Sequence, residues 1–384
     1  MCQISYKFVK NDKFAVLYYY DVIHCIGFCF RNLPPMKHVL VDMHRLKQNP
    51  YNGLYTFSKQ LGQSLAALSP EHLRLHFYLP RQQFGIFGGK QHYRAHHSID
   101  KFFMARTARY DVWHATTTIS WYRPFNRHTK FIFTVHDLNF LLEDAQRVKG
   151  NRQLLQRIQQ RINRADHLTF ISAYAKDISA QHLQLGDKPT SIIYNGCNMN
   201  QFTHFNSPRY QPSKPFLFTI GLVQPRKNFH LLPALLQHNN YELIIAGLHD
   251  FDYKKVVEAE IKKWGMTHRV RLIGPVTEEE KYWYYKNCAA FLFPSFAEGF
   301  GLPVLEAMQF GKPVFLSNQT CLPEIGGEVA YYFDNFDPVE MQQVFEKGMV
   351  HYSENDRMDK IRQRAAFFSW ERSAAQYLQI YSTI

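Results

Sequence analysis

The chain has 384 residues, with 45 Lys and Arg against 32 Asp and Glu, which gives a formal net charge of +13. Hydrophobic residues make up 46% and only six residues are Cys, so the composition excludes a disordered chain, a collagen-like chain and a fold built on disulfides. The length fits two or three domains. The basic balance predicts anionic partners, such as nucleotides, phosphates, acidic lipid surfaces or nucleic acid, without choosing among them.

The first 35 residues differ from the rest, because they hold three of the six cysteines and many aromatic residues. Their apolar stretch, residues 15–30, is interrupted by Asp21 and His24, whereas a membrane span needs about 20 mostly apolar residues. No small-residue cleavage site of a signal peptide is visible. We therefore treat residues 1–35 as an N-terminal extension; one interpretation is that the native protein starts at Met36.

From Lys37 onward, short apolar runs alternate with amphipathic stretches. The runs of the first half are residues 38–43, 75–79, 111–114, 131–136, 167–172 and 192–194. A polar stretch with three prolines, residues 204–215, predicts a linker. The runs of the second half are residues 216–221, 242–247, 270–273, 289–294, 313–316 and 329–333.

These runs are rich in Val, Ile and Phe and nearly continuous, which is typical of parallel strands covered on both faces. Their alternation with helical stretches predicts an α/β protein with two Rossmann-like doubly wound domains, each with six strands. We expect the domains to face each other across a cleft, with ligands at the carboxyl ends of the strands.

The densest chemical signal spans residues 293–308. A strand ends there, a glycine-bearing loop follows, and Pro303 suits the first turn of a helix. The backbone N–H groups of Gly299, Phe300, Gly301 and Leu302 are therefore expected to open onto a helix N-terminus, which favours an anion.

Glu298 and Glu306 flank this loop, with seven residues between them. Both can face one pocket, where two carboxylates suit a ligand that carries hydroxyls beside its phosphates. Alternatively, Glu306 only complements the helix dipole.

A second signal follows the strand at residues 216–221. Gly221 makes a turn, and the adjacent Arg226 and Lys227 begin a helix, where cations are unfavourable unless an anion offsets them. An Arg fork beside a Lys point charge suits a diphosphate. The alternative is a solvated basic pair.

Together these stretches resemble the large retaining glycosyltransferase family of GT-B architecture known as family 4, or glycosyl transferases group 1. Glu298 to Glu306 is similar to the family's Glu-x7-Glu element, Gly221 with residues 225–228 looks like its donor-diphosphate motif, and residues 322–326 match its Leu-Pro-Glu segment. The resemblance implies an acceptor domain over residues 36–205 and a nucleotide-sugar domain over residues 206–367. Residues 368–384 would cross back to the acceptor domain as a helix.

The resemblance also implies roles in the second domain. Arg226 and Lys227 would hold the donor diphosphate, Glu298 the hydroxyls of the transferred sugar, and Glu306 the nucleotide ribose. Gly221 and the backbone from Gly299 to Leu302 would complete the donor site.

In the first domain, His136 ends a strand and is placed near the reacting sugar by the resemblance; the alternative is a core or loop histidine. With Glu298, Arg226 and Lys227 it completes the predicted catalytic set. Gly53 stands where the family has a glycine loop that binds the donor, although the usual Gly-Gly is reduced to one glycine. Ser172 opens a helix and is expected to be a plain N-cap.

The implied reaction moves a hexose from a nucleotide-diphosphate-sugar, of the GDP-mannose or UDP-hexose type, to a hydroxyl with retention of configuration. The acceptor would be a saccharide or a lipid-linked saccharide in polysaccharide, lipopolysaccharide or other glycoconjugate biosynthesis. We expect no cofactor, no metal site and no nucleic-acid partner. The expected location is cytoplasmic, and the basic surface also suits the inner face of an anionic membrane.

Two metal-like patterns are interpreted otherwise. Asp250-Phe251-Asp252 follows a strand and is expected to cap a helix. His92, His96 and His97 have the spacing of helical metal ligands, but no carboxylate accompanies them, and a solvated or acceptor-facing cluster is preferred.

Two other functions stay open at this stage. A nucleotide-sugar epimerase has the same architecture but needs no acceptor. A nucleic-acid-binding protein fits the net charge and the many aromatic residues, although no zinc-finger or RNP-like motif is present.

Overall fold

The computed structural model describes residues 35–47, 52–102, 109–143 and 148–384. The predictions about residues 1–34 lie outside this part of the chain. Within it, no helix combines the length and the apolar character that crossing a membrane requires.

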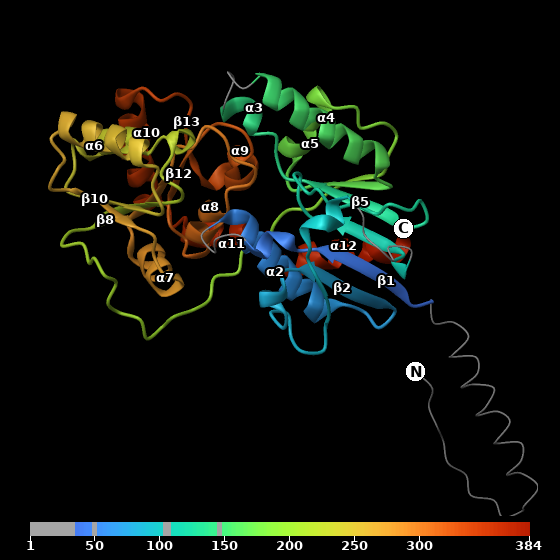
Figure 1. The fold of residues 1–384 in the computed structure, drawn as a ribbon. Helices are drawn as coiled ribbons and strands as arrows, with labels where there is room; N and C mark the ends of the chain where they lie inside the picture. Colours follow the sequence, from blue (N-terminus) through green and yellow to red (C-terminus); the bar gives the residue numbers. More distant parts are fainter. Residues whose placement is uncertain (1–34, 48–51, 103–108, 144–147) are drawn as a thin grey trace, which may run out of the picture.

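The chain forms two parallel sheets, each with helices packed around it (Figure 1). The first sheet has the strand order β3-β2-β1-β4-β5-β6-β7, and we call it, with its helices, the first lobe. Its strands are β1 (Lys37–Asp42), β2 (Leu73–Leu79), β3 (His92–Ala95), β4 (Val112–Ala115), β5 (Lys130–Val135), β6 (His167–Phe170) and β7 (Thr190–Ile192).

The second sheet has the order β10-β9-β8-β11-β12-β13 and forms the second lobe. Its strands are β8 (Phe216–Ile220), β9 (Glu242–Ala246), β10 (Val270–Gly274), β11 (Ala290–Phe293), β12 (Val314–Ser317) and β13 (Tyr331–Phe333). All pairings in both sheets are parallel, which confirms the predicted α/β class and the two doubly wound sheets.

Helices connect these strands. Those of the first lobe are α2 (Gly53–Leu68), α3 (Phe140–Glu143), α4 (Val148–Arg164) and α5 (Ala173–His182). The second lobe has α6 (Phe251–Lys263), α7 (Glu278–Asn287), α8 (Leu302–Gln309), α9 (Leu322–Gly326), α10 (Pro338–Glu354) and α11 (Met358–Ala366). Short 3-10 segments are η1 (His44–Lys47), η2 (Arg81–Gln83), η3 (Ser98–Lys101), η5 (Pro225–Lys227), η6 (Phe229–Leu236) and η7 (Gly327–Val329).

The last helix, α12 (Trp370–Thr383), returns to the first lobe, where it lies beside α2 and β1 (Figure 1). Trp370, Tyr377 and Tyr381 join the buried core that β1, β2 and α2 form. Tyr381 is also hydrogen-bonded through Oη to His114 Nδ1 at 2.6 Å. The predicted crossing of the terminal helix is therefore confirmed.

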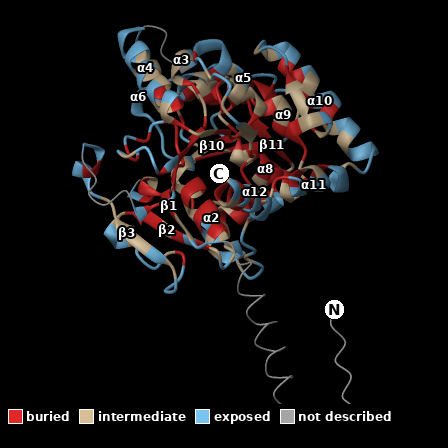
Figure 2. Ribbon diagram, turned by 90° about the vertical axis from the view of Figure 1, so that its right-hand side faces the viewer, coloured by how far each residue is buried: buried red, intermediate tan, exposed pale blue. Residues whose placement is uncertain are grey.

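The central strands of both sheets are buried, the edge strands β3, β7, β10 and β13 are mostly half-buried, and the helices present their outer faces to solvent (Figure 2). The central strands are nearly all apolar, as β4 (Val-Trp-His-Ala) and β11 (Ala-Phe-Leu-Phe) illustrate. Burial of both sheet faces explains why the sequence reads as continuous apolar runs.

The prediction of six strands in each sheet is wrong for the first lobe, where β3 makes a seventh. This strand reads His-Tyr-Arg-Ala and pairs only with β2 at the sheet edge, so it needs no apolar run. His92 lies in this strand and His96 and His97 follow it, which means that the assumed helical spacing is also wrong. Residues 204–215 contain no helix or strand and run between the two sheets, as expected of a linker.

Candidate active site

Two of the predicted site residues form a buried ion pair in the second lobe. Lys227 Nζ donates to Glu298 Oε1 at 2.5 Å, and both side chains are less than a tenth exposed. The Ser295 hydroxyl donates to the same carboxylate oxygen at 2.5 Å. Burial favours a raised pKa for Glu298, but Lys227 and Arg226 together hold this pKa below its ordinary value. Glu298 is therefore an anion at neutral pH.

Arg226 is fixed against the same loop. Its Nη1 donates to the Ala297 carbonyl at 3.1 Å, and its own carbonyl accepts from Phe296 N at 3.0 Å. Burial, reinforced by Arg226, lowers the pKa of Lys227 against the attraction of Glu298. Two neighbouring cations, Arg226 and Lys227, thus lie close to the Glu298 carboxylate.

Gly221 lies beside the Lys227 side chain. Its φ of 150° lies in the region that favours glycine, and a Cβ there would stand 3.4 Å from Lys227 Cε. Gly247, which the sequence analysis overlooked, lets the ends of β8 and β9 approach, since its Cβ would lie 1.9 Å from the Gly221 carbonyl oxygen. The position of Gly247 at the end of a predicted strand could have indicated this close approach from the sequence.

Residues 299–302 connect this loop to α8. Gly301 has a φ of 94° and is the N-cap of α8, so the first helical N–H groups begin at Leu302, as predicted. Gly299 lies against the other lobe, because a Cβ on it would meet Asp137 Oδ2 at 2.7 Å. The N-terminus of α8 therefore stands at the seam between the lobes.

Glu306 lies one turn into α8 and is gripped by α7. Lys281 Nζ donates to Glu306 Oε1 at 3.0 Å, and the Tyr285 hydroxyl donates to Oε2 at 2.8 Å. Burial disfavours the charge on Lys281, yet Glu306 and Glu278 raise its pKa. A carboxylate has about four acceptor positions, so Glu306 can still accept from a hydroxyl. Lys281 and Tyr285 were not predicted, and no motif pointed to them.

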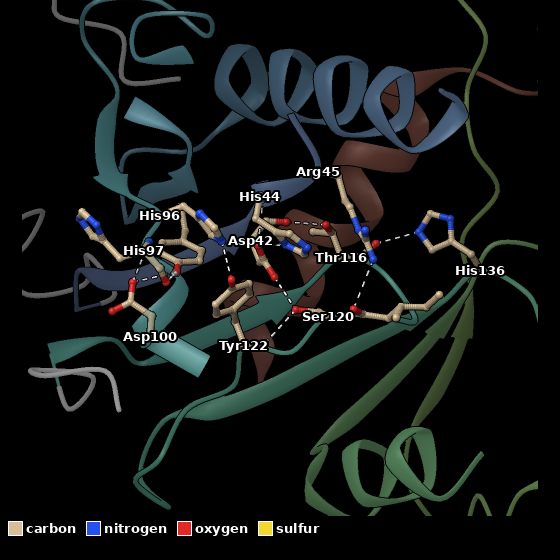
Figure 3. Close-up of polar contacts among 12 residues, drawn as sticks. Asp42, His44, Arg45, His96, His97, Asp100, Thr116, Ser120, Tyr122 and His136 are labelled. Atoms are coloured by element: carbon tan, nitrogen blue, oxygen red, sulfur yellow. Dashed lines mark hydrogen bonds and ion pairs between the residues drawn. The ribbon is translucent and has the colours of Figure 1, made fainter. Parts of the chain in front are cut away.

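In the first lobe, His136 follows β5 and is buried against Phe57, with ring centroids 4.5 Å apart. Its Nε2 lies 2.7 Å from the Thr116 carbonyl (Figure 3). Its backbone N–H donates to Thr118 Oγ1 at 2.7 Å. Because a carbonyl only accepts, Nε2 carries the proton and Nδ1 is an acceptor. Burial lowers the pKa of His136 to about 4, so the ring is neutral at pH 7.

A polar network extends from His136 across the carboxyl ends of β1 and β4 (Figure 3). Asp42 is buried and hydrogen-bonded to His44 Nδ1 at 2.7 Å and to the Ser120 hydroxyl at 2.6 Å. Burial opposes its ionisation, but His44 and Ser120 lower the pKa of Asp42. The sequence analysis missed this network, although an Asp that ends the first strand was a visible signal.

Contacts between the lobes bring the two halves of the site together. Asp137, the neighbour of His136, meets Gly299, the neighbour of Glu298. Ser172 caps α5 by accepting from Ala175 N at 3.0 Å, as predicted, and its hydroxyl also donates to the Gly299 carbonyl at 3.3 Å.

Glu324 of α9 reaches the same helix end from the second lobe. Its carboxylate accepts from Ala173 N at 2.6 Å and from Tyr174 N at 3.1 Å. The Leu-Pro-Glu segment therefore supplies a link between the lobes at the N-terminus of α5.

Gly53 begins α2 behind the N-cap Asn52, and a Cβ on it would contact nothing within 4 Å. Gly53 is exposed and lies in a helix rather than in a loop. Residues 48–51, which precede it, lie outside the part of the chain that the structure describes. Its donor-binding role stays a prediction. Asp250 accepts from Asp252 N and Tyr253 N, which confirms that the Asp-Phe-Asp pattern caps α6.

Two family models match adjoining parts of the chain. The model of glycosyl transferases group 1 matches residues 200–360, and that of glycosyltransferase family 4 matches residues 64–201. The chain is also 31% identical over 180 residues to O-antigen chain mannosyltransferase B of Escherichia coli, a match over 43% of this chain and 45% of that protein. The match thus spans less than half the length of this relative.

A longer match, 24% identical over 336 residues, covers 79% of this chain and 75% of the D-inositol 3-phosphate glycosyltransferase of Corynebacterium diphtheriae. Among solved structures, sucrose-phosphate synthase of Thermosynechococcus elongatus has a TM-score of 0.71 at 19% identity, over 90% of this chain and 98% of that one. Anabaena HepE in complex with UDP and glucose has a TM-score of 0.65 at 16% identity, over 91% and 100%. These likenesses support the two-lobed fold.

Proposed function

Because the chain belongs to the GT-B glycosyltransferases of group 1 and family 4, we propose that it transfers a hexose from a nucleotide-diphosphate-sugar to an acceptor hydroxyl with retention of configuration. The proposed sugar is mannose and the proposed product an O-antigen or related lipopolysaccharide glycan. Support for both comes from the similarity to O-antigen mannosyltransferases of Escherichia coli and Salmonella typhimurium, the latter 27% identical over 216 residues.

The observation that carries the proposal is the buried Lys227–Glu298 pair beside Arg226, at the start of α8 and against the first lobe. We propose that these cations and the backbone N–H groups at the start of α8 bind the diphosphate, and that the adjacent carboxylate binds sugar hydroxyls. Lys227 uses one N–H on Glu298 and has two more for phosphate oxygens. Glu306, held by Lys281 and Tyr285, is proposed to accept from the ribose.

Negative charge grows on the departing diphosphate while the sugar gains oxocarbenium character. Arg226, Lys227 and the N-terminus of α8 would stabilise the diphosphate. Glu298 would orient the sugar, and the neutral His136 would accept from a sugar hydroxyl at Nδ1. The seam between the lobes would keep water from the donor.

We propose that this diphosphate is bound without a metal ion. The reason is the donor set: two adjacent cations repel a divalent ion, and the nearest carboxylate, Glu298, is already paired with Lys227. The acceptor is proposed to be a saccharide or lipid-linked saccharide, used in the cytoplasm at the inner face of the membrane, which the net charge of +13 would favour.

The test is donor turnover with GDP-mannose and UDP-hexoses, in wild type, Arg226→Gln and Glu306→Gln. We expect Arg226→Gln to lower turnover by about 10²–10³, the usual cost of one preorganised donor to a developing anion. Product NMR should show the donor's anomeric configuration retained. Near-wild-type rates in both variants would overturn the proposal, and conversion of the donor sugar without any acceptor would identify an epimerase.

A further inference from the structure

A pocket of about 180 Å³ lies on the first lobe, between the loop that follows β4 and helix α4, apart from the cluster around Lys227. The loop contributes Thr118, Ile119 and Trp121, and α4 contributes Leu154, Arg157 and Arg161. Ile119, Trp121, Leu154 and Ile158 give the pocket apolar surface, Thr118, Ser120 and Gln160 give it polar surface, and the two guanidinium groups are its charged members.

The other side of this loop contacts the proposed site. Thr118 Oγ1 accepts from His136 N at 2.7 Å, and the Ser120 hydroxyl donates to Asp42 at 2.6 Å. The Ile119 carbonyl accepts from Arg45 at 3.3 Å. A ligand in the pocket would therefore be separated from His136 by only one loop.

Both arginines are held in place by Trp121. The Arg157 guanidinium lies 4.5 Å from the centroid of the Trp121 ring, and Arg161 donates to the Trp121 carbonyl at 2.8 Å. Burial, together with the neighbouring Arg123, lowers the pKa of Arg161 to about 10. In the part of the chain that the structure covers, neither Arg157 nor Arg161 forms an ion pair with a carboxylate.

In helix α6, by contrast, basic residues are paired with acidic residues of the same helix. There Lys254, Lys255 and Lys263 each pair with an acidic residue three or four positions away. Helix α4 instead carries five basic residues and no acidic one among its 17 residues. Its pocket-facing arginines therefore keep their full charge for an external anion.

We propose that this pocket binds a phosphate or diphosphate group carried by the saccharide acceptor, with its sugar against the Trp121 indole. The inference rests on the proposed function, because it names the acceptor class of that reaction. Guanidinium forks match phosphate oxygens, and an indole face packs on the apolar face of a sugar. The bound acceptor would then extend over the 118–120 loop toward His136.

The test titrates inorganic pyrophosphate by calorimetry into protein saturated with the nucleoside diphosphate that stabilises it best, so that the donor site is filled. Arg157→Gln and Arg161→Gln are compared with Arg152→Gln, which removes the same charge from an exposed position of α4 outside the pocket. We expect each pocket variant to weaken pyrophosphate binding about tenfold, and Arg152→Gln less than about twofold. Unchanged melting temperatures would show that the variants fold.

The same variants are tested on vesicles of phosphatidylglycerol and phosphatidylcholine. If they lose vesicle binding but keep their pyrophosphate affinity, the arginines recognise lipid headgroups and the proposal is overturned. It is also overturned if wild type does not bind pyrophosphate, or if Arg152→Gln loses as much as the pocket variants. Binding is measured without turnover, so a failure of the proposed function, seen as absent donor turnover in wild type, is a separate result.

Discussion

The two lobes contribute to the seam in different ways. The second lobe supplies charges that are tied to one another, as in the Lys227–Glu298 pair and the Lys281–Glu306 pair. The first lobe supplies the neutral His136, whose Nε2–H donates to the Thr116 carbonyl, and a carboxylate, Asp42, that accepts from His44 and Ser120. If the proposed function holds, the cations that stabilise the leaving group all come from the second lobe, while the first lobe adds a neutral hydrogen-bonding group.

The largest expected effect comes from breaking the Lys227–Glu298 pair. Lys227→Met keeps the length of the side chain but leaves Glu298 buried without its cation, which costs about 3–5 kcal/mol of unfolding free energy. Donor turnover should also fall by about 10²–10³, because a preorganised donor is lost. Urea unfolding and a turnover assay measure the two effects.

Lys255→Met on α6 is the matched control, since Lys255 is paired with Asp252 but is well exposed. Exposed pairs contribute about 0–1 kcal/mol. Equal losses in both variants would contradict the view that the pair at the seam differs from an ordinary surface pair.

This contrast between the lobes also explains what the sequence could reveal. Arg226, Lys227, Glu298 and Glu306 stand in two short stretches, and each stretch folds locally as a strand, a glycine turn and a helix start. These four residues can therefore be recognised as candidate site residues from the sequence alone. By contrast, the clamp on Glu306 comes from α7, and its two residues carry no motif, so only the fold reveals it.

The first lobe was harder to predict for the same reason. The residues around His136 come from loops after β1, β4 and β5, which are adjacent only because the sheet order is β1-β4-β5. Strand β3 was missed because an edge strand tolerates polar residues such as His92 and Arg94. Apolar runs identified every strand of the second sheet, where each strand lies among apolar side chains.

The second prediction compares how the stability of the two lobes depends on pH. Burial lowers the pKa of His114 in β4 to about 3, so the unfolded chain takes up a proton as the pH falls below 6.5 while the native state does not. The contribution of His114 to the unfolding free energy is therefore fully present above pH 6.5 and is lost as the pH falls toward 3. The loss should be about 1.4 kcal/mol per pH unit.

His114→Gln, which can still bond to Tyr381 or Thr134, should flatten the fall in unfolding free energy between pH 6.5 and 5 by this amount. Urea unfolding followed by circular dichroism at several pH values measures it. His268→Gln, at an exposed position in the second lobe, is the control. The lowered pKa of Glu298 acts only below its ordinary value of 4.5. Burial lowers the pKa of five first-lobe histidines (His76, His96, His114, His136 and His167) but, among the described residues of the second lobe, only that of His230, so acid should weaken the first lobe before the second. An unchanged slope in His114→Gln would contradict this order.

The third prediction concerns the clamp on Glu306. Lys281→Met removes the cation that fixes this carboxylate, while Tyr285 remains bonded to it. If Glu306 holds the ribose before and during the reaction alike, donor KM should rise about tenfold with kcat nearly unchanged. Lys286→Met, at the exposed end of the same helix, should leave both constants unchanged. A loss in kcat alone would instead show that Lys281 acts in the chemical step.

The smallest expected effect tests the link between the lobes. Glu324 gives one carboxylate oxygen each to Ala173 N and Tyr174 N at the start of α5, and a negative charge at a helix N-terminus is worth about 0.3–1 kcal/mol. Glu324→Gln keeps one acceptor oxygen but loses the charge, so the closed seam should weaken by about that amount. Since the donor is proposed to bind at this seam, its KM should rise about two- to fivefold, the equivalent of that energy. Glu328→Gln, exposed four residues later, is the control. If the two variants behave alike in steady-state kinetics, the Leu-Pro-Glu segment serves only the packing of the second lobe, and the charge that crosses the seam does not help to hold the lobes together.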